Sequence, residues 1–148
     1  MSGCGNWISV TYAGQIGLTV DAAGQPVAAI FTCSKARPII NMSEGLKASD
    51  NGKKPNVDRG TWTARRGFAG VQKLALTAPG ENWTPRRGSG LLQAGTLFIV
   101  DGGTVEVNDA SLGAVDFRTK DLARLNPDVV LVNGKIESWS VFRSYKCP

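Results

Sequence analysis

The sequence contains no histidine. Histidine is the commonest general base and a common metal ligand, so its absence excludes Ser-His-Asp and Cys-His catalytic arrangements and most zinc sites. The chain also lacks a phosphate-binding Walker loop, and Asp101-Gly102-Gly103 does not have the spacing of a dinucleotide-binding fingerprint. These absences favour a protein that is not an enzyme and that has no catalytic residues, no cofactor and no metal site.

Long hydrophobic runs are absent as well. No stretch approaches the ~20 apolar residues of a membrane-spanning helix. The first ten residues show no basic segment followed by an apolar one, so no signal peptide is recognised. We therefore expect an intracellular or virion protein that does not bind a membrane.

Cysteine is scarce: the chain has three, at Cys4, Cys33 and Cys147. An odd number makes a poor disulfide framework, and the spacings match no metal-binding motif. The simplest interpretation is free thiols in a reducing compartment. A Cys4–Cys147 pair is the alternative, because chain termini often lie close together.

Turn residues, in contrast, are plentiful, and there are enough apolar residues for a core. The 148 residues include 18 Gly and 7 Pro, scattered without a repeat period, and 42% are hydrophobic. Many turns around short apolar segments are typical of a sheet protein. We predict a single all-β domain over residues 1–148: a sandwich or barrel of short, mostly antiparallel strands with at most one or two short helices.

Alternating apolar residues locate the expected strands. Ile16, Leu18 and Val20 share one face, and the turn sequence at 21–24 leads into a second arm at 27–33, which together predict a hairpin. Asn133-Gly134 is the strongest hairpin signal in the chain. Further strands are expected at 7–12, 61–66, 72–77, 96–101, 104–108, 114–118, 129–132 and 135–143, with a tight turn at 101–103 and a short helix at 121–125.

Positive charge is concentrated in the middle of the chain. The formal net charge is +5, but residues 35–88 hold eleven Lys and Arg against four Asp and Glu, a net charge of +7, and the remainder carries −2. Residues 35–60 show no strand pattern, so we expect a long basic loop or extension there, with a helical turn at 42–48. A basic segment of this kind indicates an anionic partner or a charge-matched subunit.

A hexapeptide pattern occurs twice in this basic segment. Residues 62–67 read Trp-Thr-Ala-Arg-Arg-Gly and residues 83–88 read Trp-Thr-Pro-Arg-Arg-Gly, which indicates a small internal repeat. Arginine pairs present fork-shaped donors for phosphate or carboxylate, and tryptophan offers a face for stacking on a base or a sugar. The candidate anion- or partner-binding residues are Trp62, Arg65, Arg66, Trp83, Arg86 and Arg87.

Strand alternation gives a second interpretation of the same residues. In a strand, Trp62 and Ala64 point to one side, and Thr63 and Arg65 point to the other. The tryptophan is then a core residue, and the arginines form either a solvated edge or a contact with a neighbouring subunit. Anion binding, an interface with an acidic protein and a solvated edge all stay open on sequence grounds.

Four acids lie close together in the sequence: Asp101, Glu106, Asp109 and Asp116. They could converge at one end of a sheet as an acid/base pair, or hold a hard cation. The simpler interpretation is ordinary turn and surface residues, since Asp is favoured in turns by local hydrogen bonding.

The leading hypothesis is a non-enzymatic structural or assembly protein, such as a small virion or tail component, that self-associates as a homo-oligomer or decorates a larger protein scaffold. The alternative is a nucleic-acid- or polyanion-binding module, or an inhibitor, that uses the repeated hexapeptide. A third hypothesis is a carbohydrate-binding module with Trp62 and Trp83 as sugar platforms. An enzyme built on the four acids is the least favoured.

Overall fold

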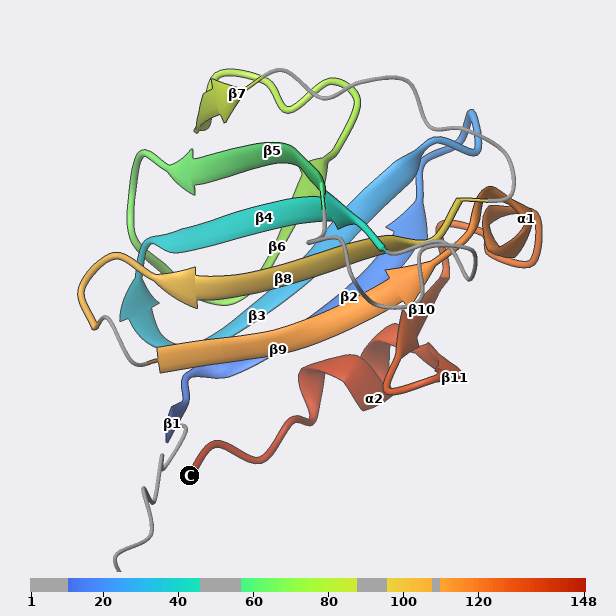
Figure 1. The fold of residues 1–148 in the computed structure, drawn as a ribbon. Helices are drawn as coiled ribbons and strands as arrows, with labels where there is room; N and C mark the ends of the chain where they lie inside the picture. The colour runs from blue at the N-terminus through green and yellow to red at the C-terminus, as the bar shows by residue number, and fades with distance from the viewer. Residues whose placement is uncertain (1–10, 46–56, 88–95, 108–109) are drawn as a thin grey trace, which may run out of the picture.

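Two facing β-sheets and two short helices make up the fold in the computed structural model, which describes residues 11–45, 57–87, 96–107 and 110–148 (Figure 1). The six-stranded sheet has the order β1-β9-β8-β4-β5-β7, and the five-stranded sheet has the order β11-β10-β2-β3-β6. The elements are β1 (Thr11–Tyr12), β2 (Gly14–Val20), β3 (Pro26–Ala36), β4 (Pro38–Glu44), β5 (Val57–Ala64), β6 (Phe68–Ala75), β7 (Trp83–Arg87), β8 (Phe98–Thr104), β9 (Ala110–Phe117), α1 (Thr119–Leu122), β10 (Val129–Val132), β11 (Lys135–Ser138) and α2 (Trp139–Arg143). The described pairs are antiparallel except β1 with β9, so the all-β, sandwich-like fold predicted from the sequence is confirmed.

The main core lies between the two sheets. The hairpin predicted over residues 15–33 is present as β2 and β3, and it contributes Leu18 and Ile30 from one side. The six-stranded sheet contributes Ile40 and Val100 from the other side. All four side chains are fully buried, so the alternation of apolar residues correctly predicts the inward face of β2.

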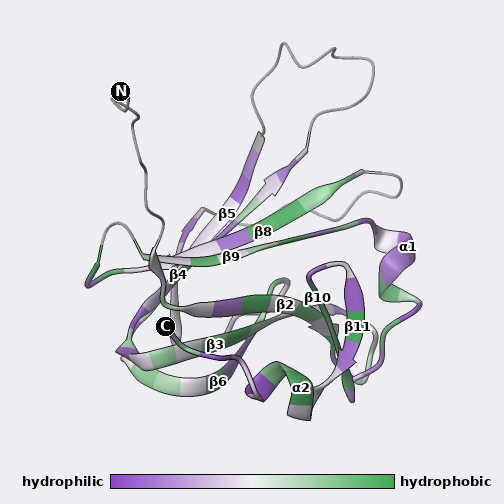
Figure 2. Ribbon diagram, turned by 90° about the horizontal axis from the view of Figure 1, so that it is seen from below, coloured by the Kyte–Doolittle hydropathy of each residue, from purple (hydrophilic) through white to green (hydrophobic). Residues whose placement is uncertain are grey.

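A second, smaller apolar cluster covers the outer face of the five-stranded sheet, where α2 packs (Figure 2). Phe142 of α2 is buried there against Ala29, Val130 and Val132. β2 is therefore buried on both faces, which alternation alone does not predict. Gly17 leaves the room that this packing needs, because a Cβ there would lie 2.5 Å from the Val130 Cγ1.

The closing hairpin is predicted correctly at its turn and wrongly at its end. Asn133 and Gly134 adopt positive φ angles of 52° and 76°, as a two-residue turn between antiparallel strands requires. The strand expected over 135–143 ends at Ser138. The Ser138 hydroxyl accepts a hydrogen bond from the Val141 N–H (3.3 Å) and caps α2, so the chain turns into a helix.

The two helices are short. α1 begins two residues before the helix predicted at 121–125, and α2 has five residues. Within the described ranges, no helix is long and apolar enough to cross a membrane.

The expected basic loop over residues 35–60 is wrong where the structure describes this segment. β3 continues to Ala36, and β4 pairs with β5 on one side and β8 on the other, so β4 is a central strand. The expected helical turn at 42–48 is wrong for residues 42–44, which belong to β4, and residues 46–56 lie outside the described residues. The strand pattern is hidden because Glu44 interrupts the apolar alternation; it is buried and forms an ion pair with Arg59.

The tight turn expected at 101–103 is also wrong. β8 runs through these residues, with Asp101 opposite Asn41 on one side and Ala114 on the other. Glycine is needed here because a neighbouring strand of the sheet approaches closely, and not because the chain turns. A Cβ on Gly102 would lie 2.9 Å from the Ile40 Cδ1. The return strand expected at 104–108 is absent from the described part of this range, and residues 108–109 lie outside it.

Cys33 on β3 and Cys147 near the C-terminus form a disulfide bond, with their Cα atoms 5.8 Å apart. The expectation of free thiols is therefore wrong for these two residues. Cys147 is not available to Cys4, which lies outside the described residues. The bond joins residues 114 positions apart and ties the tail after α2 to the five-stranded sheet.

Candidate functional site at the paired repeats

The two copies of the repeated hexapeptide lie side by side as β5 and β7 (Figure 1). Thr63 of the first copy pairs with Thr84 of the second, and these are equivalent positions of the repeat. Trp62, the first residue of one copy, pairs with Pro85, the third residue of the other copy. Ala64 and Trp83 pair in the same way, with the copies interchanged. The two copies are thus related by a local two-fold axis between the threonines.

Both tryptophans of the repeat are in the core. Trp62 is 1% exposed and Trp83 is 2% exposed, and both belong to the main apolar cluster between the sheets. Gly60 leaves space for the Trp62 indole, because a Cβ at this position would lie 2.9 Å from the ring. Neither indole face can stack on a ligand, so the assignment of Trp62 and Trp83 as contact residues or sugar platforms is wrong.

Arg65, Arg66 and Arg86 of the repeat, in contrast, are exposed to solvent. Arg65 and Arg66 are exposed in the turn between β5 and β6, where the Arg65 N–H donates to the Asn82 carbonyl (2.9 Å). Arg86 is exposed on β7, and Arg87 pairs with Thr61 in the strand register. Among the described residues, the side chains of Arg65, Arg66 and Arg86 form no ion pair.

The local two-fold axis separates the two arginine pairs. Because β5 and β7 run in opposite directions, Arg65-Arg66 follows one end of the strand pair, and Arg86-Arg87 lies at the other. A strand rises about 3.3 Å per residue, which puts the pairs roughly 15 Å apart. The sequence predicts one site of six residues, whereas the structure divides them into two buried anchors and two separate basic groups.

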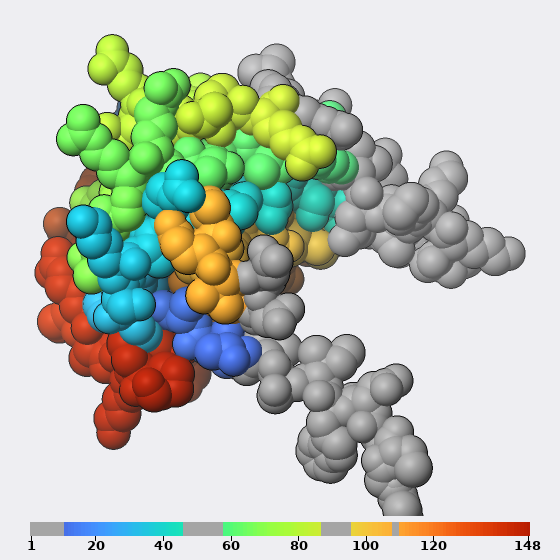
Figure 3. All heavy atoms as spheres, turned by 90° about the vertical axis from the view of Figure 1, so that its left-hand side faces the viewer, coloured from blue at the N-terminus to red at the C-terminus, as the bar shows by residue number. Residues whose placement is uncertain are grey.

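Lys35 joins the first arginine pair at one end of the sandwich. The turn that holds Arg65 and Arg66 passes beside it, since a Cβ on Gly67 would lie 3.3 Å from the Lys35 Cγ. Figure 3 views the molecule from this side: the segment between β3 and β4, the turn after β5 and the segment after β8 gather there. We call Lys35, Arg65 and Arg66 the basic end.

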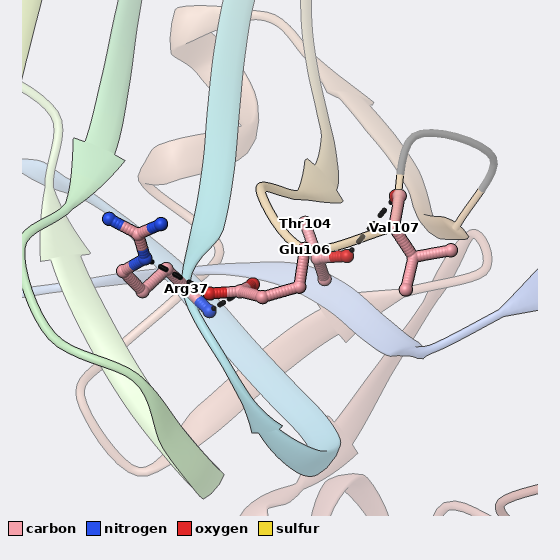
Figure 4. Close-up of polar contacts among 4 residues, drawn as sticks. All are labelled: Arg37, Thr104, Glu106 and Val107. Atoms are coloured by element: carbon pink, nitrogen blue, oxygen red, sulfur yellow. Dashed lines mark hydrogen bonds and ion pairs between the residues drawn. The ribbon is translucent and has the colours of Figure 1, made fainter.

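Arg37 also lies at this side of the molecule, but its charge is neutralised (Figure 4). Its main-chain N–H and its guanidinium Nε each donate to the Glu106 carboxylate at 3.0 Å. These hydrogen bonds, the main-chain one first, hold the pKa of Glu106 below its ordinary value of 4.5. The Thr104 hydroxyl donates to the Val107 carbonyl (3.3 Å), a hydrogen bond that stabilises the segment after β8 in which Glu106 lies.

Two other cations of the basic segment have structural partners. Arg59 forms its ion pair with the buried Glu44, and the Lys73 ammonium lies 4.7 Å from the centre of the Trp139 ring. Such contacts hold side chains against the protein and reduce their availability to a ligand. A count of charges along the sequence therefore overstates the free positive surface.

A small hollow adjoins the basic end. It measures about 210 Å³ and is lined by Arg66, Gly67, Phe68, Gln72 and Asn82. Ligand pockets usually enclose about 300–1,000 Å³, so this hollow suits a side chain of a partner better than a cofactor.

β7 is an edge strand with two features that discourage pairing with another strand. Pro85 has no N–H to donate, and the register between β5 and β7 is interrupted by a bulge next to Trp62. A partner at this edge would accordingly be bound through arginine side chains rather than by main-chain strand addition.

The four acids do not form one cluster. Asp101 pairs with Ala114 and Asp116 pairs with Ile99, so these two acids are diagonal neighbours on the outer face of the six-stranded sheet. Glu106 is bound to Arg37 beyond the end of β8, and Asp109 lies outside the described residues. Within the described ranges, no three Cys, Asp or Glu side chains are placed to hold a metal ion.

The chain matches no known protein-family model, no curated protein sequence and no solved structure. The function proposed below therefore rests on the chemistry and geometry of the described residues.

Proposed function

We propose that this protein is a non-enzymatic assembly protein whose copies bind one another, with the basic end of one copy against the acidic outer face of the next. The observation that carries the proposal is the pairing of Thr63 with Thr84, which buries both tryptophans and leaves Arg65 and Arg66 exposed. The acidic outer face is defined by Asp101 and Asp116, the diagonal neighbours on β8 and β9.

Charge and geometry support a carboxylate-bearing partner. Arginine presents a planar fork that binds a carboxylate through two parallel hydrogen bonds. Asp116 is exposed on the six-stranded sheet, away from the turn that carries Arg65 and Arg66. A contact between two different surfaces of identical chains is head-to-tail, and it builds a ring or a filament rather than a closed dimer.

A virion or tail is one setting for such an assembly. The Cys33–Cys147 disulfide supports this setting over a reducing intracellular compartment, because disulfides persist on virion surfaces and in oxidising compartments. The same bond removes two of the three cysteines from the free-thiol argument for an intracellular location.

Light scattering over a range of protein concentrations tests the proposal. We expect the mean mass to rise with concentration and to fall as salt screens the contact. Arginine-selective labelling read by mass spectrometry should show Arg65 and Arg66 protected at high concentration. A monomer at every concentration, with both arginines fully labelled, would falsify the proposal.

Binding of nucleic acid or another polyanion is the second candidate function. It is favoured by the exposure of Arg65, Arg66 and Arg86 without an ion pair among the described residues. The burial of both tryptophans weighs against it, since single-stranded nucleic acid is usually held by stacking on aromatic faces as well as by charge. Binding of a DNA duplex or of heparin that weakens steeply with salt, by a protein that stays monomeric, would favour this candidate.

A further inference from the structure

A groove at the seam between the two sheets is separate from the basic end. Two adjoining hollows of about 380 and 340 Å³ share Gln15, Asn133 and Tyr145 in their walls. Tyr12 flanks the second hollow, and Gly113 of β9 forms part of its opposite wall. We call this the tyrosine groove; each hollow falls within the range of about 300–1,000 Å³ that is usual for ligand pockets.

The groove exists because β2 and β9 belong to different sheets and lie side by side without pairing. β1 pairs with β9 only at Ala110 and Ser111, after which the chain bends and continues as β2 in the other sheet. β10 pairs with β2 only at Leu18. Over residues 14–16 and 112–114, one edge of each strand therefore has no strand partner within the described residues. The Gly113 N–H on this edge already donates to the Ser111 hydroxyl oxygen (2.9 Å), so binding of a polar ligand would depend mainly on the side chains that line the groove.

The amide side chains of Gln15 and Asn133 have unused hydrogen-bonding capacity. The Gln15 amide donates to the Phe142 carbonyl (2.8 Å), which fixes the side chain, and its own oxygen has no partner among the described residues. Asn133 sits at the tip of the β10–β11 turn with φ 52°, and none of the described hydrogen bonds uses its amide. The Gln15 amide is already fixed, so it can bind a hydroxyl group with little further loss of side-chain entropy, and the Asn133 amide offers donors and an acceptor on the exposed turn.

Two aromatic rings flank these amides. Tyr12 is 49% exposed, and the Tyr145 ring packs on Phe31 with the ring centres 6.0 Å apart. Cys147, two residues after Tyr145, is bonded to Cys33 and anchors the tail that carries the ring. A tyrosine presents an apolar face and a hydroxyl together, which suits a ligand with apolar and polar faces.

The charges of the groove cancel. Lys135 and Glu137 line the first hollow, one of each sign, and no other charged residue lines either hollow. A neutral ligand is therefore favoured over an anion. We propose that the tyrosine groove binds a neutral saccharide, with its hydroxyls on the Gln15 and Asn133 amides and its ring faces on Tyr12 and Tyr145.

Nuclear magnetic resonance titration of the isotope-labelled, disulfide-intact protein tests this site. The probes are maltotriose, cellotriose, mannotriose and triacetylchitotriose, each at millimolar concentration. We expect at least one of them to shift the side-chain amide signals of Gln15 and Asn133. Signals unmoved by all four sugars, or shifts confined to other parts of the protein, would contradict the proposal.

Variants define the contacts with the sugar that binds. Tyr12→Ala removes an exposed ring, and Asn133→Gly removes the amide while keeping a residue suited to positive φ; each should weaken binding about threefold to tenfold. Tyr145→Phe retains the ring and should change affinity less than Tyr12→Ala. Unchanged affinity in both Tyr12→Ala and Asn133→Gly, with dispersed spectra that show folding, would overturn the assignment.

Two controls separate this site from the rest of the surface. Ile136→Ala alters an exposed apolar residue that does not line either hollow, and it should leave the affinity unchanged. Arg65→Glu/Arg66→Glu should also bind the sugar normally, so failure of the assembly proposal and failure of the saccharide proposal are distinguishable.

Discussion

Thr63 and Thr84 lie directly opposite each other on adjacent antiparallel strands, and they occupy the same position in two copies of one hexapeptide. In both copies the tryptophan is buried in the core, whereas Arg65, Arg66 and Arg86 are exposed at the surface. Alternation along each strand turns the tryptophans inward, and the turn after β5 carries Arg65 and Arg66 outward.

The buried tryptophans should be stability residues and not binding residues. Trp62→Ala or Trp83→Ala should lower the free energy of unfolding by about 3–5 kcal/mol, because each leaves a large cavity between the sheets. Trp139→Ala, at a partly exposed ring, is the matched control and should cost less. Urea denaturation measures all three; equal, small losses at the three positions would show that the repeat tryptophans are not core residues.

The disulfide should contribute substantially to stability. Cys33→Ser/Cys147→Ser opens a covalent loop that spans 114 positions and should lower the free energy of unfolding by about 2–4 kcal/mol. Thiol titration of the unfolded, unreduced wild type should detect one free cysteine out of three. Detection of three free thiols in protein isolated without reductant would contradict the pairing.

Glu106 should titrate below its ordinary range. The main-chain N–H and guanidinium of Arg37 stabilise the charged carboxylate, so the folded-state pKa of Glu106 lies below 4.5. Its contribution to stability is thus fully present above the unfolded-state pKa and is lost as the pH falls through the lowered folded-state value. Carboxyl-detected magnetic resonance gives the midpoint directly, and Glu106→Gln should remove this part of the acid dependence. A titration midpoint of Glu106 at or above 4.5 would contradict this prediction.

Arg37→Ala is the matched variant for this pair. It removes the guanidinium but keeps the main-chain N–H, which makes the larger contribution to the lowered pKa. The midpoint of Glu106 should therefore rise only part of the way towards its ordinary value. A full return would mean that the main-chain hydrogen bond contributes nothing.

Much of the fold could be predicted where the signal is local. The 15–33 hairpin and the Asn133-Gly134 turn follow from alternation and from the need for positive φ. Gly102 misleads for a physical reason: glycine marks either a turn or a close approach, and only the packing of Ile40 distinguishes them. The sequence offers no such information before the sheet is assembled.

The candidate site was harder to predict than the fold. The repeat itself identifies the strands that pair, but their antiparallel register, which separates the arginine pairs, depends on contacts between strands distant in sequence. The tyrosine groove has no motif at all, because Tyr12, Gln15, Asn133 and Tyr145 come from opposite ends of the chain. The disulfide, which helps to hold these ends together, joins positions whose spacing matches no known pattern.

The head-to-tail contact predicts that charge reversal on either surface weakens assembly and that reversal on both restores it. Arg65→Glu/Arg66→Glu places two negative charges against Asp101 and Asp116 of the neighbouring copy. Lys120→Glu/Lys146→Glu makes the same change in net charge at exposed residues elsewhere, so it controls for a general effect of charge. Only the first variant should lose the concentration-dependent rise in mass.

Light scattering of the combined variant, Arg65→Glu/Arg66→Glu with Asp101→Lys/Asp116→Lys, is the most direct measurement of the contact. Because both partners of the contact are reversed together, we predict that self-association returns towards the wild-type level. If the combined variant stays monomeric while folded, or if Arg65→Glu/Arg66→Glu alone assembles like the wild type, the basic end does not bind the acidic outer face.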